Sequence, residues 1–397
     1  MSYAVPGVRL GVAQAGIKKA GKDDLLLIAL SEKTQTAAVF TQNAFCAAPV
    51  EVARNHLARS LGKSQYLLIN TGNANAGTGE EGLMGAMSCC ATLGTLAGTP
   101  DTAVLPFSTG VIGEPLPVDR IEKAIPLAFG ALQTDHWERA AAAILTTDTR
   151  PKLRTLTLKI DGQPCVITGI AKGAGMICPN LATMLAFIAT DAAIASPLLD
   201  ILLRNAVNKS FNRITVDGDT STNDAVTLSA TGESGVAIEE GSQQAKDFSE
   251  ALDALMIGLA QDIVRDGEGA TKFVEIRVAG GESEAACDQV ARTIAHSPLV
   301  KTALFAADPN WGRILAAIGR AGLEGLDTKM VSIEINGVLI AEHGARAASY
   351  TESLGQSAMN NDELRLCVTL QRGAAQSLLW TTDLSYDYVK INAEYRT

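Results

Sequence analysis

The chain has 397 residues, of which 47% are hydrophobic and 19% charged, and its 33 basic and 43 acidic side chains give a formal net charge of −10. This composition predicts a globular protein with a large core, two domains being favoured over one, and the acidic balance disfavours nonspecific binding to nucleic acid or an anionic membrane. The first residues carry no secretory pattern and no stretch is long and apolar enough to span a bilayer, so we expect a cytoplasmic protein.

Hydrophobic periodicity predicts strands and helices in mixed order along the first half of the chain. Strands are expected at 25–30, 66–70 and 102–107, and at 153–160 and 166–170, where Asp161-Gly162 forms a hairpin turn. Helices are expected at 83–96, 118–132 and 135–145, and Pro126 should kink or end the second of them.

The second half continues the same mixed pattern. Helices are expected at 197–210, 248–263 and around 287–296, and strands at 213–216, 331–340, 364–370 and 386–391. No internal repeat or low-complexity linker marks a domain edge. The fold class expected from this order is mixed α/β.

The cysteines and histidines give no sign of a metal centre. Seven cysteines are scattered without a CxxC pair, which predicts reduced thiols and neither disulfides nor a zinc site. The four histidines are dispersed and form no HExxH pattern. We therefore expect no bound metal or cofactor, and a hydroxyl nucleophile would need a base other than histidine.

Two further segments resemble ligand-binding loops. Residues 77–82 match GxGxxG, but a six-residue loop separates them from the expected strand, and Glu80 and Glu81 would repel a pyrophosphate. A capped turn is favoured there, and a nucleotide-binding or non-catalytic protein is kept as an alternative. The acidic run 217–224 lacks the closing glutamate and flanking helices of a calcium loop, so we interpret it as a solvated turn between strands.

The expected strand at 102–107 stops at Ser108-Thr109-Gly110. A turn of this kind can project a hydroxyl and a backbone N–H together, which is what an oxyanion hole requires. An ordinary strand-ending turn is the alternative, and the residues alone favour it.

The stretch from Lys172 to Asp191 holds the candidate nucleophile. A glycine-rich approach with one lysine runs through Pro179 into an apolar strand, and Thr183, directly behind Ala182, is its first hydroxyl. An α-amine, freed by cleavage just before the nucleophile, is an established base for such a hydroxyl. Thr183 is therefore our candidate nucleophile.

Six segments, taken in chain order, resemble the ornithine acetyltransferase family, also called glutamate N-acetyltransferase. They cover nearly the whole chain, which makes them more specific together than any single motif. The segments are 73–76, 108–110, 146–149, 172–177 continuing to 181–185, 308–313 and 390–397.

The resemblance implies a self-cleaving enzyme. Cleavage between Ala182 and Thr183 would give an alpha fragment, 1–182, and a beta fragment, 183–397, that together build a layered α/β sandwich beside a smaller C-terminal α/β domain. The family likeness gives Thr183, Thr109 and Gly110 catalytic roles. It assigns substrate binding to Thr146, Lys172, Thr183, Glu268, Asn392 and Thr397, with Thr147 as an alternative to Thr146.

The resemblance also implies a reaction. Thr183 would carry acetyl as an ester from N-acetylornithine to glutamate, in arginine biosynthesis, with acetyl-CoA as a further possible donor substrate. Two alpha and two beta fragments would assemble into a heterotetramer. An N-terminal-nucleophile amidase or aminopeptidase, with water as the acceptor, is the alternative enzyme.

Overall fold

The computed structural model describes residues 2–19, 21–178 and 184–394. Two compact units are present: the first comprises Met1–Asn212 and Asp219–Ile263, and the second comprises Arg213–Gly218 and Val264–Thr397. The first unit therefore takes residues from both sides of the expected cleavage point. Among the helices of the described residues, none combines the length and apolar character needed to cross a bilayer.

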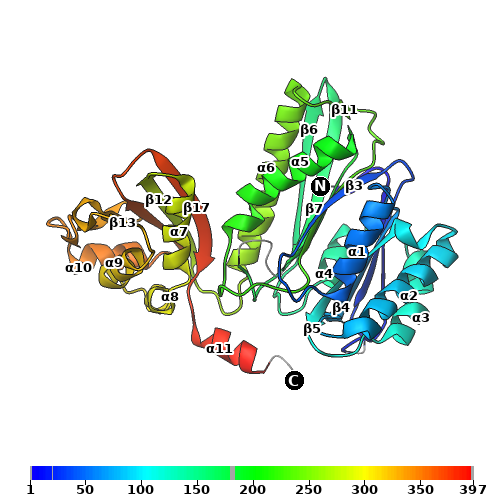
Figure 1. The fold of residues 1–397 in the computed structure, drawn as a ribbon, viewed down its shortest axis with the longest axis horizontal. Coiled ribbons are helices and arrows are strands. Elements are labelled where there is room, and N and C mark those ends of the chain that lie inside the picture. The colour runs from blue at the N-terminus through cyan, green and yellow to red at the C-terminus, as the bar shows by residue number, and fades with distance from the viewer. Residues whose placement is uncertain (1, 20, 179–183, 395–397) are drawn as a thin grey trace. The chain divides into compact units, whose positions relative to one another are not determined.

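The first unit contains two main sheets (Figure 1). One has the order β1-β2-β4-β5, and the other has the order β3-β10-β8-β7-β6. Only the β4–β5 and β8–β10 neighbours are parallel within these sheets. A short parallel pair joins β9 and β11. The strands are β1 (Val8–Ala13), β2 (Leu25–Leu30), β3 (Gln35–Phe40), β4 (Tyr66–Asn73), β5 (Val104–Val111), β6 (Lys152–Ile160), β7 (Gln163–Lys172), β8 (Leu185–Thr190), β9 (Ala193–Ile194), β10 (Ala225–Ala230) and β11 (Ala237–Ile238).

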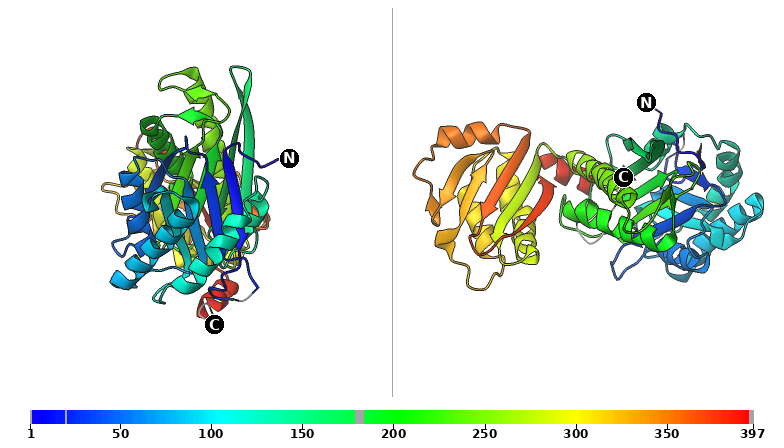
Figure 2. Two further views of the ribbon diagram at one scale, coloured as in Figure 1. Left: turned by 90° about the vertical axis from the view of Figure 1, so that its right-hand side faces the viewer. Right: turned by 90° about the horizontal axis from the view of Figure 1, so that it is seen from above.

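Helices cover the outer faces of these sheets, which gives a layered α/β sandwich (Figure 2). The α2 and α3 helices pack on the first sheet, and α5 packs on β3 and β10. Leu255 and Leu259 of α6 lie against Gly169 of β7. The helices of this unit are α1 (Ala48–Arg59), α2 (Gly79–Ala97), α3 (Val118–Gly130), α4 (Trp137–Ala143), α5 (Ser196–Lys209) and α6 (Gln243–Arg265).

The strand β2 shows why the sequence builds this sandwich. All six residues of Leu25–Leu30 are buried. Leu25 and Leu27 belong to the core under α2 and α3, whereas Leu26 and Ile28 belong to the core between the two sheets. Successive strand side chains point to opposite faces, so a continuous apolar run is what a strand buried on both faces needs. Between the sheets, Phe107 and Phe187 meet edge to face at 5.1 Å.

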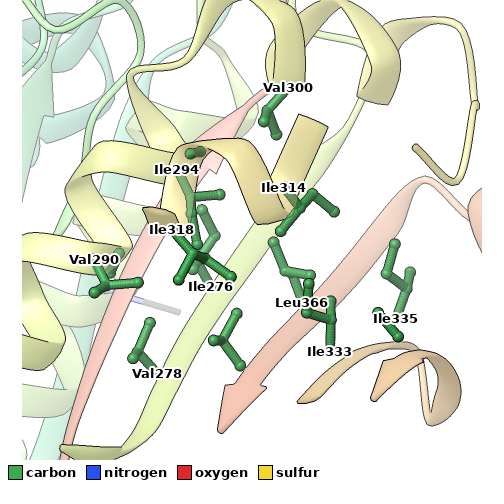
Figure 3. Packing of buried hydrophobic residues seen from close by; sticks show 14 of the residues in the cluster. Ile276, Val278, Val290, Ile294, Val300, Ile314, Ile318, Ile333, Ile335 and Leu366 are labelled. Carbon is green, nitrogen blue, oxygen red and sulfur yellow. The ribbon is translucent and has the colours of Figure 1, made fainter. Parts of the chain in front are cut away.

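The second unit is a six-stranded sheet in the order β15-β14-β13-β16-β12-β17. Its core gathers apolar side chains of the sheet and of α7, α8 and α9, including Ile276, Ile294 and Ile314 (Figure 3). The strands are β12 (Phe273–Gly281), β13 (Ser332–Ile335), β14 (Val338–Glu342), β15 (Ala345–Arg346), β16 (Glu363–Thr369) and β17 (Ala375–Thr382). The helices are α7 (Glu284–Ala295), α8 (Pro298–Phe305), α9 (Trp311–Gly319), α10 (Glu352–Met359) and α11 (Tyr386–Ala393).

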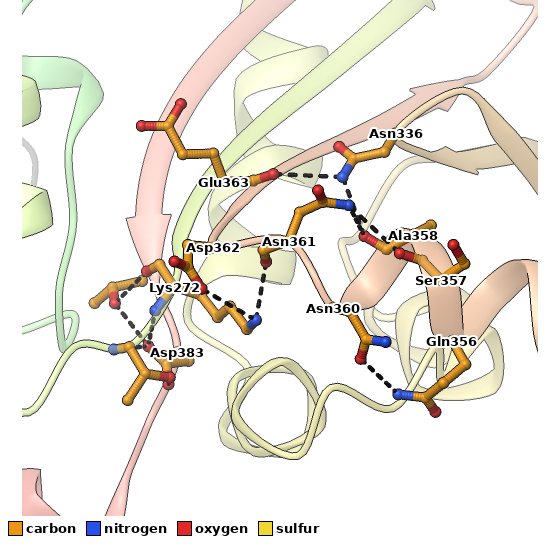
Figure 4. Close-up of polar contacts among 12 residues, drawn as sticks. Lys272, Asn336, Gln356, Ser357, Ala358, Asn360, Asn361, Asp362, Glu363 and Asp383 are labelled. Carbon is orange, nitrogen blue, oxygen red and sulfur yellow. Dashed lines mark hydrogen bonds and ion pairs between the residues drawn. The ribbon is translucent and has the colours of Figure 1, made fainter.

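Polar contacts fasten the loops at one end of this sheet (Figure 4). Asn336 donates to the carbonyls of Ala358 and Glu363, and the Lys272 ammonium donates to the carbonyl of Asn361. The carboxylate of Asp383 accepts the backbone N–H of Lys272. These bonds satisfy backbone groups that the sheet ladder leaves open.

The second unit corrects three sequence predictions. The strand expected at 386–391 is wrong, because this segment is α11, and Ser385 caps it by accepting the N–H of Tyr388. The strand expected at 213–216 is also wrong: its only ladder contact in the described chain is a single bridge between Ile214 and Trp380. The segment expected as one strand at 331–340 is a hairpin of β13 and β14.

Two predictions in the first unit also need correction. The strand expected to end at 107 runs on to Val111, so Thr109 and Gly110 lie within β5. Of the two outcomes expected for Pro126, a kink or an end of the helix, the structure excludes the end, because α3 continues to Gly130. Since Pro lacks an N–H, the helix loses one hydrogen bond there, and the buried residues Ile121, Ile125 and Ala128 hold the apolar face in place.

Candidate active site

Lys172, the last residue of β7, lies among polar groups from three segments. Its Nζ atom is 3.2 Å from Oγ1 of Thr109 on β5 and 2.9 Å from Oγ1 of Thr146. It also lies 3.9 Å from a carboxylate oxygen of Asp148. Lys172 is only 3% exposed, so its charge is held inside the unit by these partners.

Asp148 connects this lysine to the start of the glycine-rich approach. Its Oδ1 accepts Lys152 Nζ at 2.5 Å and the backbone N–H of Gly173 at 2.7 Å, and its Oδ2 accepts the N–H of Thr146 at 3.1 Å. Burial alone would raise the pKa of this carboxyl, but the Lys172 and Lys152 charges and the hydrogen bonds hold the pKa well below its usual range. Asp148 is therefore a buried carboxylate that positions both Lys172 and the chain after it.

Gly110 allows β5 to approach β4 unusually closely. Its φ is 141°, and a Cβ atom there would lie 2.2 Å from the carbonyl carbon of Gly72 and 2.4 Å from the nitrogen of Asn73. Only glycine fits such a position without moving backbone. The register of β4 and β5 shifts at the same place, between Gly72 and Asn73. This irregularity interrupts the regular ladder at the residue whose N–H was expected to serve an oxyanion hole.

The direction of the lysine hydrogen bonds decides what the two threonines can do. An ammonium group is only a donor, so the hydroxyl oxygens of Thr109 and Thr146 accept from Lys172. Each hydroxyl hydrogen then remains available to donate elsewhere. Thr146 and Thr147 were both considered from the sequence, and the structure shows the hydroxyl of Thr146 on Lys172.

The run 217–224, expected to be a solvated turn, is partly buried. Ser221, Asn223 and Asp224 are 3%, 7% and 1% exposed, so the expectation is wrong for these three residues. Asn223 donates to the carbonyls of Ala74 and Ser108, at 2.6 and 3.0 Å. The loop therefore holds the backbone immediately before Thr109.

Met184 is the first described residue after the expected cleavage point, and the same loop fixes it. Its N–H donates to Oδ1 of Asp224 at 2.9 Å, and its carbonyl accepts the N–H of Ala225 at 3.2 Å. The parallel pairing of β8 with β10 then begins at Leu185 and Ala225. Both backbone groups of Met184 are thus bonded at the entrance of β8.

The second unit brings two other expected site residues together. Asn392 of α11 donates to Oε2 of Glu268 at 2.7 Å, and Glu268 is 8% exposed. Ser385, which caps α11, donates to the carbonyl of Gly269, the residue after Glu268, at 2.7 Å. Glu268 is thus a largely buried carboxylate with an amide partner. Such a group can accept hydrogen bonds from an ammonium.

Comparison with known proteins decides the family. The sequence model of the ArgJ family matches residues 9–397. The chain belongs to the ArgJ family. It is 56% identical to the arginine biosynthesis bifunctional protein ArgJ of Methylococcus capsulatus, over 99% of this chain and 96% of the relative. It is 51% identical to the protein of the same name from Pseudomonas syringae pv. tomato, over 100% of this chain and 97% of the relative.

A solved structure also resembles the chain. It is a crystal structure of the arginine biosynthesis bifunctional protein ArgJ from Bacillus halodurans, with a TM-score of 0.50 and 38% sequence identity. The match covers 53% of this chain and 98% of the solved one. The expected resemblance to this family is thereby confirmed, as is the mixed α/β fold.

Three of the residues expected in an ArgJ-family site lie outside the described residues: Ala182, Thr183 and Thr397. The structure brings Thr109, Thr146 and Lys172 together in the first unit and Glu268 and Asn392 together in the second. Sequence reasoning passed over Asp148, Lys152 and Asp224. The sequence held one signal for Asp148 and Lys152, since these opposite charges lie four residues apart in the polar run that follows α4.

The nucleotide-binding alternative at 77–82 finds little support in the structure. The capped turn expected there is wrong for residues 79–82, which form the start of α2, and Thr78 makes no side-chain cap. A hollow of about 200 Å³ beside these residues is lined by Gly77, Glu81 and Gly82 among others, and it is smaller than a typical small-molecule pocket. Gly82 serves packing, because a Cβ atom on it would lie 1.9 Å from Oγ1 of Thr78. Among the described residues, no group of three or more His, Cys, Asp or Glu side chains could hold a metal ion.

Proposed function

We propose that this ArgJ-family chain is a glutamate N-acetyltransferase, or ornithine acetyltransferase, that cleaves its own Ala182–Thr183 bond. The observation that carries the proposal is the position of Lys172, whose ammonium holds the hydroxyls of Thr109 and Thr146 at the end of the strand that leads to Thr183. The names of the relatives support the pathway: each is an arginine biosynthesis bifunctional protein.

In the cleavage step, the Thr183 hydroxyl oxygen attacks the Ala182 carbonyl carbon and the peptide C–N bond breaks, which leaves an ester and a free α-amine. Water then hydrolyses the ester, giving Ala182 a carboxylate and returning the Thr183 hydroxyl. The size of the Bacillus halodurans chain supports this step, since about half of this chain, 53%, accounts for 98% of that one. A cleaved relative would yield chains of that size.

In the transfer step, the α-amine of Thr183 acts as the base. An ordinary α-amine has a pKa of about 7.7–8.0, so much of it is neutral near pH 7.5 and can accept the hydroxyl proton. Thr183 attacks the acetyl carbonyl of N-acetylornithine, the C–N bond breaks, and the proton passes to the ornithine amine that leaves. The amine of glutamate then attacks the acetyl ester, forms N-acetylglutamate and returns the proton to Thr183.

The remaining residues receive roles that match their chemistry. Thr109, whose hydroxyl hydrogen is available, and the N–H of Gly110 would stabilise the negative oxygen of the tetrahedral intermediate. Lys172 would bind a substrate carboxylate, with Thr146 donating beside it, and Glu268 would bind a substrate ammonium. Asn392 would orient Glu268, and Thr397 would complete the substrate-binding set.

Three further parts of the proposal concern donor, assembly and location. The relatives are named bifunctional, which supports acetyl-CoA as a second acetyl donor. Strands β3, β6 and β7 come before the cleavage point and β8 and β10 come after it, yet they form one sheet, so cleaved fragments would stay paired. We expect two such pairs to form a heterotetramer in the cytoplasm.

An assay of acceptors tests the proposal against the amidase alternative. The purified protein is given N-acetylornithine with glutamate or with buffer alone, and N-acetylglutamate, ornithine and acetate are quantified. We expect N-acetylglutamate to form in step with ornithine and little acetate without glutamate. Equal release of acetate with and without glutamate would instead identify an amidase. Replacing N-acetylornithine by acetyl-CoA tests the second donor.

A further inference from the structure

Ser385 is a largely buried hydroxyl, 6% exposed, that the acetyl-transfer chemistry above does not use. Its Oγ accepts the N–H of Tyr388 at 3.3 Å, which caps the start of α11, and it donates to the carbonyl of Gly269 at 2.7 Å. A hydroxyl has one donor hydrogen and two acceptor lone pairs, so both bonds can exist at once. Ser385 therefore connects the first turn of α11 to the residue that follows Glu268.

Gly269 lets this helix approach closely. Its φ is 67°, and a Cβ atom there would lie 2.5 Å from Oγ of Ser385 and 2.5 Å from the nitrogen of Tyr388. A side chain at this position would push the helix away, so glycine is needed for both its space and its positive φ. The turn that carries Glu268 and the first turn of α11 are thus in direct contact.

The two segments are also fixed from the side of the sheet. β12 and β17 pair antiparallel, and beyond the end of their ladder the Asp383 carboxylate accepts the backbone N–H groups of Thr271 and Lys272, at 2.8 and 3.0 Å. The bond from Ser385 to Gly269 lies two residues further along each segment. It therefore extends the pairing of the two segments as far as the Glu268 turn.

Asn392, near the other end of α11, reaches the same turn. Its Nδ2 donates to Oε2 of Glu268 at 2.7 Å and to the carbonyl of Tyr388 at 3.0 Å. An amide nitrogen has two hydrogens, so both are engaged. The turn is therefore held by α11 at two points, its backbone by Ser385 and its carboxylate by Asn392.

We propose that Ser385 is a positioning residue for substrate binding at Glu268. By joining the Gly269 carbonyl to the start of α11, it keeps the Glu268 carboxylate and the Asn392 amide in contact. This inference rests on the proposed function, in which Glu268 binds a substrate ammonium. Ser385 acts through these residues and not on the substrate itself. The alternative is that Ser385 only caps α11 and stabilises the second unit.

Two substitutions remove the connection. Ser385→Ala loses both hydrogen bonds. Ser385→Gly also loses the bond to Gly269, but glycine is an acceptable capping residue, so this variant tests the inference even if the alanine variant does not fold. Ser283→Ala is the matched control, because Ser283 caps α7 in the same unit by accepting the N–H of Ala286 at 3.1 Å. In the described structure no hydrogen bond joins Ser283 to the Glu268 turn.

The experiment measures self-cleavage by intact mass and the steady-state kinetics of acetyl transfer in wild type and the three variants, with urea unfolding to show that each is folded. The two substrates differ in charge. N-acetylornithine has one ammonium, on its side chain, because its other amine is acetylated. The only amine of glutamate must be uncharged to attack. A damaged ammonium site should therefore weaken the binding of N-acetylornithine selectively.

We expect both Ser385 variants to self-cleave and to raise KM for N-acetylornithine about tenfold, the lower end of the effect of losing a hydrogen bond to a charged group. The values of kcat and of KM for glutamate should stay within about threefold of wild type, since lost ground-state binding raises KM without lowering kcat. Ser283→Ala should keep the wild-type KM for N-acetylornithine although it also loses a helix cap.

The outcomes are distinct. A wild-type KM for N-acetylornithine in a folded Ser385 variant would overturn the inference and leave the proposed function standing. So would an equal rise of this KM in Ser283→Ala, or a fall in kcat at unchanged KM. A wild-type chain that neither cleaves nor transfers would overturn the proposed function and this inference together.

Discussion

The carboxylate of Asp148 accepts a 2.7 Å hydrogen bond from the backbone N–H of Gly173, the residue that follows Lys172. The same carboxylate faces the ammonium groups of Lys152 and Lys172. One buried carboxylate therefore lies against the lysine ammonium at the end of β7 and also binds the backbone where the chain leaves this strand.

Replacing this acid should strongly destabilise the first unit. Asp148→Asn leaves the ammonium groups of Lys152 and Lys172 buried without their carboxylate, and breaking a buried pair in this way costs about 3–5 kcal/mol. Urea unfolding measures the loss. Asp200→Asn is the control, since the exposed Asp200–Arg204 pair contributes only about 0.3–0.5 kcal/mol. A similar, small loss in both variants would contradict the importance of Asp148.

The same carboxylate predicts a component of acid sensitivity. Burial alone would raise the pKa of this carboxyl in the folded chain, but the charges of Lys172 and Lys152 lower it. Stability from this group is therefore present above the unfolded value of about 3.9 and is lost as the pH falls toward the folded value. Urea midpoints between pH 5 and pH 3 should fall less steeply in Asp148→Asn than in wild type. Parallel curves would refute the prediction.

Gly110→Ala should lower kcat for acetyl transfer. A Cβ atom there meets backbone atoms of Gly72 and Asn73 at 2.2 and 2.4 Å, so the strand and the Gly110 N–H must move. Losing one oxyanion donor lowers kcat by about 10²–10³-fold. Steady-state kinetics on Gly110→Ala measures this.

Gly113→Ala is the matched control for that substitution. Gly113 also has a positive φ, 84°, but no heavy atom lies within 4 Å of its Cβ position. We expect only the backbone cost of an L-residue at positive φ, about 1–2 kcal/mol of stability, and nearly unchanged kcat. Equal losses of kcat in both variants would show that Gly110→Ala acts through general backbone strain and not through loss of an oxyanion donor.

Lys172→Met should weaken transfer by removing the proposed partner of the substrate carboxylate. Hydrogen bonds to charged groups contribute about 1.5–3 kcal/mol, which corresponds to a loss of about 10- to 150-fold in kcat/KM. The control is Lys209→Met, which removes a lysine whose side chain is 56% exposed. A Lys172→Met enzyme with wild-type kcat/KM would exclude Lys172 from substrate binding.

Lys301 predicts an alkaline effect in the second unit. Burial lowers the pKa of this ammonium from its ordinary value near 10.5 to about 8, although Asp383 and Asp217 oppose the shift. Between these two values the unfolded chain binds more protons than the folded one, so this group makes stability rise with pH, by about 3 kcal/mol at most. Below about pH 8 its burial gives no such gain.

Urea unfolding at pH 7.5 and pH 10 checks this effect. Lys301→Met should lose the rise that wild type owes to Lys301, so the difference in stability between the two proteins should change with pH. Its absolute stability is a separate matter, because Lys301 also donates to Thr381 and Thr382. A pH-independent difference would show that Lys301 titrates normally.

Particular segments show how far the sequence could predict this structure. The apolar run at 25–30 has six consecutive buried residues, and no helix or turn competes for it, so its strand could be predicted. The segment 386–391 is rich in the aromatic and β-branched residues that favour strands, yet it forms α11. Ser385 caps the helix by accepting the N–H of Tyr388, a contact that contributes about 1 kcal/mol and that residue composition alone does not reveal.

The site shows a similar limit. Lys172 and Thr109 could be named from family-like segments, but their contact joins residues 63 positions apart and depends on the packing of two sheets. Asp224 stands in a run of acidic and hydroxyl residues that is typical of exposed loops. Its burial arises because the loop enters the space between β3, β5 and β8, and no pattern within the run encodes that.

A comparison of wild type with Thr183→Ala, by intact mass and by acetyl transfer from N-acetylornithine to glutamate, tests whether Thr183 is both the cleavage point and the nucleophile. Wild type should yield two fragments, one ending at Ala182 and one beginning at Thr183, and should transfer acetyl. Thr183→Ala should stay at full length and transfer none. A Thr183→Ala protein that still transferred acetyl, or an active wild-type chain that remained uncleaved, would contradict this assignment of Thr183.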